Sequence, residues 1–219
     1  MPTFGFAAFL KIASLNSKPQ KTELRKRLFP TPGQAYDFHR SLKLASKKLL
    51  VDGIPIDGLL EAAKDVAKLP ERKSLISGLT KLGLWREGAT GDTYKVPSKV
   101  YESPRRLFKI AAQPEFGLVN GPSRIAFQIW NTKRPDLKAE AAYSTLALLP
   151  ELYAADEWQP SDFGVLSLHE PKAHLLSERA VSPLSVDRLI RSVEDVILQI
   201  LDEHRGPPPA GIGDYRPPT

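Results

Sequence analysis

The spacing of apolar residues predicts a chain with helices along its first half and at its C-terminal end. Apolar positions recur three or four residues apart in several segments, and Pro or Gly separates most of them. The last of these segments has the clearest amphipathic pattern, so we expect it to pack against the core. The predicted helices span residues 35–50, 57–69, 71–82, 136–153 and 185–204.

Short apolar runs in the second half predict a sheet. The predicted strands span residues 107–112, 116–119, 125–130, 163–168 and 173–177. Asn120-Gly121 predicts a hairpin between the second and third of them. The run 125–130 is apolar on both faces, which is typical of an interior strand. We therefore predict an α+β fold with a mixed sheet of about four to five strands and a long C-terminal helix.

The pattern divides the chain into three zones. Residues 1–100 form a basic, mainly helical region, and residues 101–205 form an α/β domain. Residues 206–219 are rich in Pro and Gly, and we expect this tail to be disordered because it offers little apolar surface to bury. The sequence leaves open whether the first two zones are separate domains or one continuous fold.

Charge is distributed unevenly along the chain. Residues 1–50 hold ten Lys and Arg against two acids, a local net charge of +8, whereas residues 111–219 hold ten against fifteen, a net of −5. A basic surface at one end calls for an acidic partner, either nucleic acid or an acidic protein. The candidate nucleic-acid-binding residues are Lys18, Lys21, Arg25, Lys26, Arg27, Arg40, Lys43, Lys47, Arg72, Lys73 and Lys81.

The helix-helix-hairpin order predicted over residues 57–96 resembles a winged helix-turn-helix. In that interpretation the segment 73–85 supplies the third helix and the first wing strand, and Gly88-Ala89-Thr90-Gly91 is the wing tip. The resemblance implies a recognition helix in the major groove of DNA. The alternative is a three-helix packing unit with a surface hairpin.

The second zone resembles the core of the PD-(D/E)xK nuclease superfamily in the order of its elements. Glu115 and the segment Asn131-Thr132-Lys133 stand where the resemblance implies the first acid and the acid-x-Lys motif. Asn131 occupies the position of the second acid, and a neutral amide contributes no charge to a divalent cation. An active nuclease would need another carboxylate close to Glu115, for which Glu140 is the candidate.

Other chemistry has little support in the sequence. There is no cysteine, no apolar run of the ~18 residues that a membrane span requires, and no phosphate-binding loop. His169 and His174 offer two ligands, fewer than a zinc site needs. We predict no metal, no cofactor and no membrane contact. We interpret the apolar start, residues 4–10, as a buried element and expect a cytoplasmic protein.

These observations favour a non-enzymatic binding or regulatory protein whose basic N-terminal region contacts nucleic acid. The alternative is a protein-interaction subunit of a larger assembly, and the third hypothesis is a degenerate or active PD-(D/E)xK-like nuclease. Nucleic acid is favoured if the key cations share one face. A protein partner is favoured if they are scattered and an apolar patch is exposed. The cations that decide this are Lys21, Arg25, Arg40, Lys43 and Lys81.

Overall fold

A mixed sheet of five strands lies at the centre of the described part of the chain. A computed structural model describes residues 1–31, 39–170 and 172–205. The strand order is β2-β5-β6-β7-β8, with β6 parallel to β7 and the other neighbours antiparallel. The strands of this central sheet are β2 (Asp92–Tyr94), β5 (Phe116–Asn120), β6 (Ser123–Trp130), β7 (Asp162–Ser167) and β8 (Lys172–Leu175).

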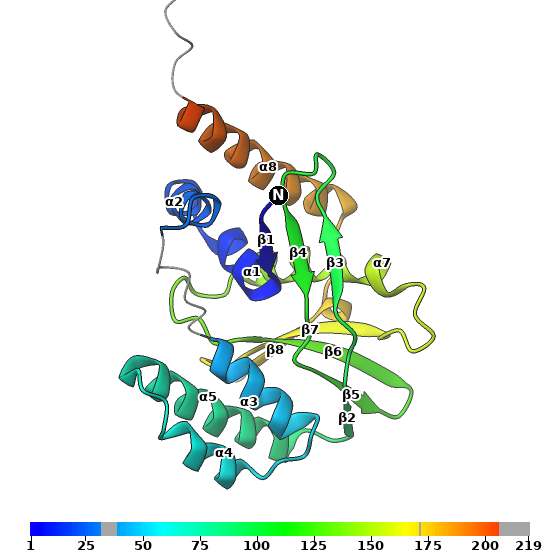
Figure 1. The fold of residues 1–219 in the computed structure, drawn as a ribbon. Helices are drawn as coiled ribbons and strands as arrows, with labels where there is room; N and C mark the ends of the chain where they lie inside the picture. The colour runs from blue at the N-terminus through cyan, green and yellow to red at the C-terminus, as the bar shows by residue number, and fades with distance from the viewer. Residues whose placement is uncertain (32–38, 171, 206–219) are drawn as a thin grey trace, which may run out of the picture.

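A smaller sheet of three strands stands beside the central one (Figure 1). Its order is β1 (Thr3–Gly5), β4 (Lys109–Ala112) and β3 (Lys99–Glu102), with β1 parallel to β4. Both sheets therefore join strands from either side of residue 100, because β1 pairs with β4 and β2 pairs with β5.

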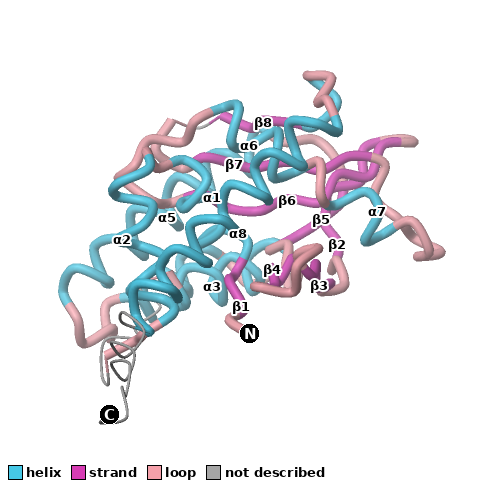
Figure 2. The backbone as a smooth tube through the Cα atoms, turned by 90° about the horizontal axis from the view of Figure 1, so that it is seen from above, coloured by secondary structure: helices cyan, strands magenta, loops and turns pink. Residues whose placement is uncertain are grey.

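Helices cover both faces of the central sheet. On one face lie α3 (Arg40–Leu50), α4 (Ile56–Ala63) and α5 (Leu69–Gly88). On the other lie α1 (Phe6–Ser14), α6 (Ala139–Leu146) and α8 (Pro183–Arg205), which pass over the strands in the view of Figure 2. The remaining elements are α2 (Ser17–Leu28), which packs on α8, the short α7 (Leu149–Tyr153) and the 3₁₀ turn η1 (Leu176–Glu178).

Each face of the sheet has its own apolar core because side chains alternate along the strands. Phe127 and Ile129 of β6 pack with Leu79 of α5 in what we call the α5-side core. Ala126 and Trp130 of the same strand pack in what we call the α8-side core. The apolar character of both faces of 125–130 is thus explained by an interior strand, as predicted, and the α+β class is confirmed.

Several predicted boundaries are wrong. Residues 84–88 continue α5 as a helix, so the predicted wing hairpin over 84–96 does not form, and β2 pairs with β5 instead. Gly83 does not end the helix. It lies inside α5, where a side chain would collide with Ile56. The helices α3, α4 and α5 pack together as a three-helix unit, which was the alternative.

The second zone holds one more correction. The single helix predicted over 136–153 is two, α6 and α7, separated at Ala147 and Leu148. The strands predicted at 116–119, 125–130 and 163–168 are present as β5, β6 and β7. The tail 206–219 and the start of the helix predicted from residue 35 lie outside the described residues.

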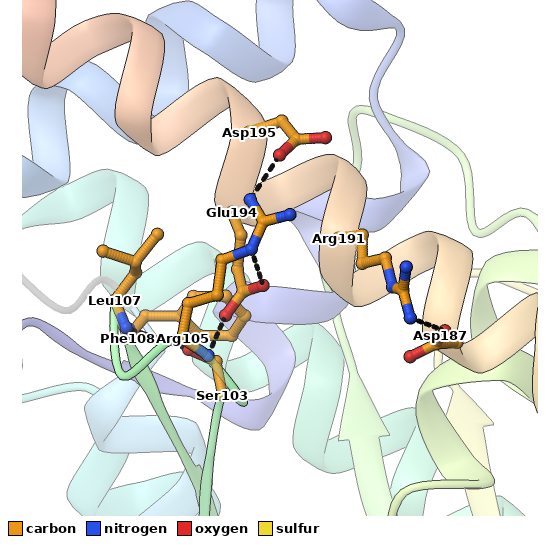
Figure 3. A network of polar contacts seen from close by, with 8 residues as sticks. All are labelled: Ser103, Arg105, Leu107, Phe108, Asp187, Arg191, Glu194 and Asp195. Atoms are coloured by element: carbon orange, nitrogen blue, oxygen red, sulfur yellow. Dashed lines mark hydrogen bonds and ion pairs between the residues drawn. The ribbon is translucent and has the colours of Figure 1, made fainter.

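A buried carboxylate ties α8 to the turn between β3 and β4 (Figure 3). Glu194 is 1% exposed and accepts a hydrogen bond from the backbone N–H of Arg105 at 2.8 Å. The Arg105 guanidinium lies 3.6 Å from the same carboxylate and donates to Asp195 at 2.6 Å. Ser103 accepts the N–H groups of Leu107 and Phe108, which closes the turn. This network fixes the small sheet against α8.

Candidate functional site

The acid predicted for a nuclease site, Glu115, lies buried at the start of β5. It is 3% exposed, and its Oε2 accepts a hydrogen bond from the backbone N–H of Ile129 at 2.8 Å. Its own N–H donates to the carbonyl of Phe127 at 2.9 Å. These two hydrogen bonds hold the Glu115 carboxylate against β6, next to the end of the β5–β6 strand pair.

Burial raises the pKa of Glu115 to about 7, and the nearby charges of Lys43 and Lys47 on α3 oppose that rise. No carboxylate is among the groups that perturb its pKa, and Glu140 is exposed at the start of α6. At neutral pH the Glu115 site therefore holds a mixture of carboxylic acid and carboxylate beside two cations.

Of the other two nuclease candidates, Asn131 is held by a hydrogen bond and Lys133 is exposed to solvent. Asn131 follows β6 at the same end of the sheet as Glu115, and its amide donates to Ser74 Oγ of α5 at 3.1 Å. Lys133 is exposed. The structure therefore brings Glu115 and Asn131 to one end of the sheet, while the cations that perturb Glu115 are Lys43 and Lys47.

Sequence reasoning missed one residue beside Glu115. Gln128 lies between Phe127, whose carbonyl accepts the N–H of Glu115, and Ile129, whose N–H donates to the Glu115 carboxylate. Gln128 is 3% exposed, and its amide nitrogen has no hydrogen-bond partner among the described residues. The hairpin register alone could not have found this neighbourhood, because the ladder of β5 and β6 begins at Phe116 and leaves Glu115 outside it.

A small cavity opens at this end of the sheet, between α1, α3 and the end of β6. Its volume of about 20 Å³ is enough for one water molecule. Apolar side chains from α3 and β6 form part of its wall, and polar ones form the rest. The lining residues are Ala7, His39, Leu42, Lys43, Ser46, Ile129, Asn131 and Thr132.

Lys43 is the one cation among the described residues that line this cavity. Arg40, Lys47 and Lys133 do not line it, but each is next in the chain to a residue that does. Lys73 precedes Ser74, which binds the lining residue Asn131. We call Arg40, Lys43, Lys47, Lys73 and Lys133 the cationic rim; they come from α3, from α5 and from the segment after β6. The helix α3 itself carries four cations and no acid.

The cations of α2 are partly neutralised by acids. Glu203 of α8 forms ion pairs with both Lys21 and Arg25. Glu23 pairs with Arg27 at 2.9 Å. Lys18 and Lys26 are exposed, and no ion pair to a described residue engages them.

The five cations that were to decide between partner classes do not share one face. Lys21 and Arg25 lie on α2 and pair with Glu203 of α8, Arg40 and Lys43 lie on α3, and Lys81 lies on α5. The helix α2 is separate from α3 and α5 (Figure 1). Arg72 is the remaining nucleic-acid-binding candidate. Its guanidinium donates to the carbonyl of Val66 at 2.8 Å, a contact within the fold that holds the start of α5.

Two negative findings apply to residues 1–31, 39–170 and 172–205. Within these ranges no three His, Asp or Glu side chains lie close enough together to hold a metal ion. None of the helices there combines the length and apolar composition needed to cross a membrane.

Comparisons with known proteins give no family. No protein-family model matches the chain, and no curated protein matches it. Among solved structures, the chain is similar to one titled "Crystal structure of SSO0001", at a TM-score of 0.39 and 10% sequence identity. The match covers 90% of this chain and 76% of that one. A likeness this weak shows neither the fold nor the function of the chain.

Proposed function

We propose that this chain is a non-enzymatic binding protein whose basic N-terminal region contacts nucleic acid. Because the five deciding cations are spread over α2, α3 and α5, the proposal does not use them as one face and rests on the cationic rim alone. The observation that carries the proposal is the composition of α3, which has four cations and no acid and faces a cavity at the end of the sheet. Several cations carried by one helix suit a phosphate backbone, whose charges are closely and regularly spaced.

Two buried acids lie near α3. Glu71 of α5 accepts a hydrogen bond from Ser41 Oγ at 2.5 Å, and burial raises the pKa of Glu115 to about 7, so Glu115 is only partly ionised at neutral pH. Arg40 and Lys73 are exposed, and neither has an ion pair or hydrogen bond to a described residue. The rim therefore retains positive charge that a polyanion would neutralise.

The residues at the Glu115 site support binding rather than catalysis. A hard divalent cation is usually held by one or two ionised carboxylates. The pKa of Glu115, near 7, leaves it partly protonated. The amide of Asn131 donates to Ser74, and among the described residues no group of three His, Asp or Glu side chains lies close enough to hold a metal ion. This constellation retains the order of elements that resembles a nuclease without a full set of metal ligands.

The proposal is tested by fluorescence anisotropy with labelled duplex DNA, single-stranded DNA and RNA over a salt series. We expect binding whose logarithm falls linearly with the logarithm of salt concentration. Neutralising two rim cations in the variant Arg40→Gln/Lys73→Gln should lower the slope by about 2 for duplex DNA, because two phosphate contacts are lost.

The matched control is Lys95→Gln/Arg188→Gln, which removes two exposed cations outside the rim. Its salt slope should equal that of the wild-type protein. Failure of the wild-type protein to bind any of the three probes at about 50 mM salt would contradict the proposal, since counterion release is strongest there. Equal loss in both double variants would show that net charge, and not the rim, is responsible.

A further inference from the structure

A shallow hollow of about 380 Å³, open to solvent, lies away from the cationic rim at the C-terminal end of α5. It is lined by Lys81, Leu84, Trp85, Gly88 and Ala89. We call it the α5 groove. Lys73 of the rim precedes Leu84 by eleven residues on the same helix, a rise of about 16 Å.

One of the residues that line the α5 groove carries a large apolar side chain exposed to solvent. Leu84 is 64% exposed and lies in the last turns of α5. Gly88 and Ala89 add little side-chain bulk to the lining. An exposed leucine beside a hollow of this size leaves apolar surface that another molecule would cover.

The walls of the α5 groove are held in place by packing on their inner side. The Trp85 ring lies 5.3 Å from that of Phe116 and 5.7 Å from that of Phe127, both in the α5-side core. The Arg86 guanidinium donates to the carbonyls of Ala89 at 2.8 Å and Gly91 at 3.0 Å. A groove that is already ordered loses little conformational entropy when a ligand enters.

The lining offers apolar surface and one positive charge. Lys81 is the single charged residue among the five that line the groove, and no ion pair to a described residue engages it. A small polar metabolite needs several converging polar groups, which this lining does not supply. A protein segment needs an apolar anchor and one or two charge contacts.

We propose that the α5 groove is a docking site for a segment of a partner protein that carries a Leu- or Phe-sized side chain next to a carboxylate. The apolar side chain enters between Leu84 and Trp85, and the carboxylate pairs with Lys81. None of the five lining residues belongs to the cationic rim, so this proposal does not rest on the rim, and it assigns Lys81, one of the predicted nucleic-acid-binding residues, to a protein partner instead.

The experiment is selection from a phage-displayed library of random twelve-residue peptides on the full-length protein, with counter-selection on Leu84→Ser. We expect enriched sequences with Asp or Glu within three positions of Leu, Phe or Trp. The most enriched peptide, made with a fluorescent label, should bind the wild-type protein and weaken at least tenfold on Lys81→Glu. Its chemical-shift perturbations in ¹⁵N-labelled protein should centre on residues 81–89.

The matched control is Leu184→Ser, because Leu184 of α8 is 66% exposed and lies outside the groove. This variant should bind the labelled peptide like the wild-type protein, and so should Arg40→Gln/Lys73→Gln. If no sequence is enriched on wild-type protein over Leu84→Ser, or if enriched sequences are basic, the α5 groove is not an acidic-peptide site. The outcome of the DNA titration does not alter either conclusion.

Discussion

At the scale of single residues, Glu115 is a carboxyl group whose environment in the fold differs strongly from that in the unfolded chain. Its carboxylate loses hydration on burial. In the fold it accepts one backbone hydrogen bond, from Ile129, and lies near the positive charges of Lys43 and Lys47. Burial is the largest of these effects, so the folded protein holds the proton of Glu115 up to a pH of about 7, above the ordinary value of 4.5. Ionising Glu115 is therefore unfavourable to folding.

This gives a pH-dependent prediction for Glu115→Gln. Between pH 4.5 and about 7 the folded wild-type protein binds one proton more than the unfolded chain, so its free energy of unfolding falls as pH rises. The variant cannot ionise there, so its stability relative to wild type should rise by about 1.4 kcal/mol per pH unit in this window and level off above it. Urea unfolding of both proteins from pH 4.5 to 8.5 measures this. A difference that does not change with pH would contradict the environment described for Glu115.

Glu194 is also a buried acid, but unlike Glu115 it has an ion-pair partner, Arg105. Its carboxylate accepts the Arg105 N–H and faces the Arg105 guanidinium (Figure 3). We expect Glu194→Ala to lower the free energy of unfolding by about 2 kcal/mol, since charge-assisted hydrogen bonds of a buried group are lost. Asp195→Ala, which removes the exposed neighbour of the same guanidinium, should cost less than about 1 kcal/mol. Urea denaturation distinguishes them, and equal effects would mean that burial of Glu194 is unimportant.

At the scale of elements, the sequence predicted whether a segment is a helix or a strand better than it predicted where that element ends. The strands β5, β6 and β7 were predictable because Asn120-Gly121 and the doubly apolar run 125–130 are strong local signals. The end of α5 was not, because Gly83 is a stop signal only when the chain is considered locally. In the fold, Gly83 packs against Ile56 of α4, and that tertiary contact lets the helix run on to Gly88.

The candidate site was predictable only in part, for a similar reason. Glu115 and Lys43 are each visible as candidate residues, yet nothing local places α3 beside the start of β5. That juxtaposition depends on how the three-helix unit docks on the sheet. Likewise Glu203 lies about 180 residues from its partners on α2, so the neutralisation of Lys21 and Arg25 has no sequence signal.

The pairing of β6 with β7 gives a prediction at this scale. Gly164 lies beside Phe127 in the parallel register, and a Cβ there would lie 2.6 Å from the Phe127 ring and 2.9 Å from Leu175. The Phe127 ring is itself stacked on Phe116, so it has little room to move. We expect Gly164→Ala to lower the free energy of unfolding by about 1–3 kcal/mol through overpacking.

The control for this prediction is Gly58→Ala. Gly58 lies within α4, and a Cβ there would meet nothing within 4 Å. That substitution should stabilise the protein by up to about 1 kcal/mol, because alanine favours helix over glycine. Thermal unfolding followed by circular dichroism gives the sign for each variant. A neutral Gly164→Ala would argue against the close approach of β7 to Phe127.

At the scale of the whole molecule, one sheet serves two cores. Phe127 and Ile129 belong to the α5-side core, while Ala126 and Trp130 of the same strand belong to the α8-side core. Loss of either helical layer would expose a full face of apolar side chains on β6 to water. Two strand pairs also join the first hundred residues to the rest of the chain, because β1 pairs with β4 and β2 pairs with β5. The two cores should therefore unfold together.

The tryptophans allow this prediction to be tested core by core. Trp85 packs against the α5-side core and Trp130 lies in the α8-side core, whereas Trp158 is 62% exposed and contributes a background signal. In Trp130→Phe the fluorescence change on unfolding reports the α5-side core, and in Trp85→Phe it reports the α8-side core. In each variant the urea midpoint by fluorescence should coincide with that by far-ultraviolet circular dichroism, which reports all helices. Coincidence would mean that ligands at the cationic rim and at the α5 groove act on a single cooperative unit. Separate midpoints would mean that the α3–α5 layer unfolds on its own, because the shared strand β6 would then fail to couple the cores.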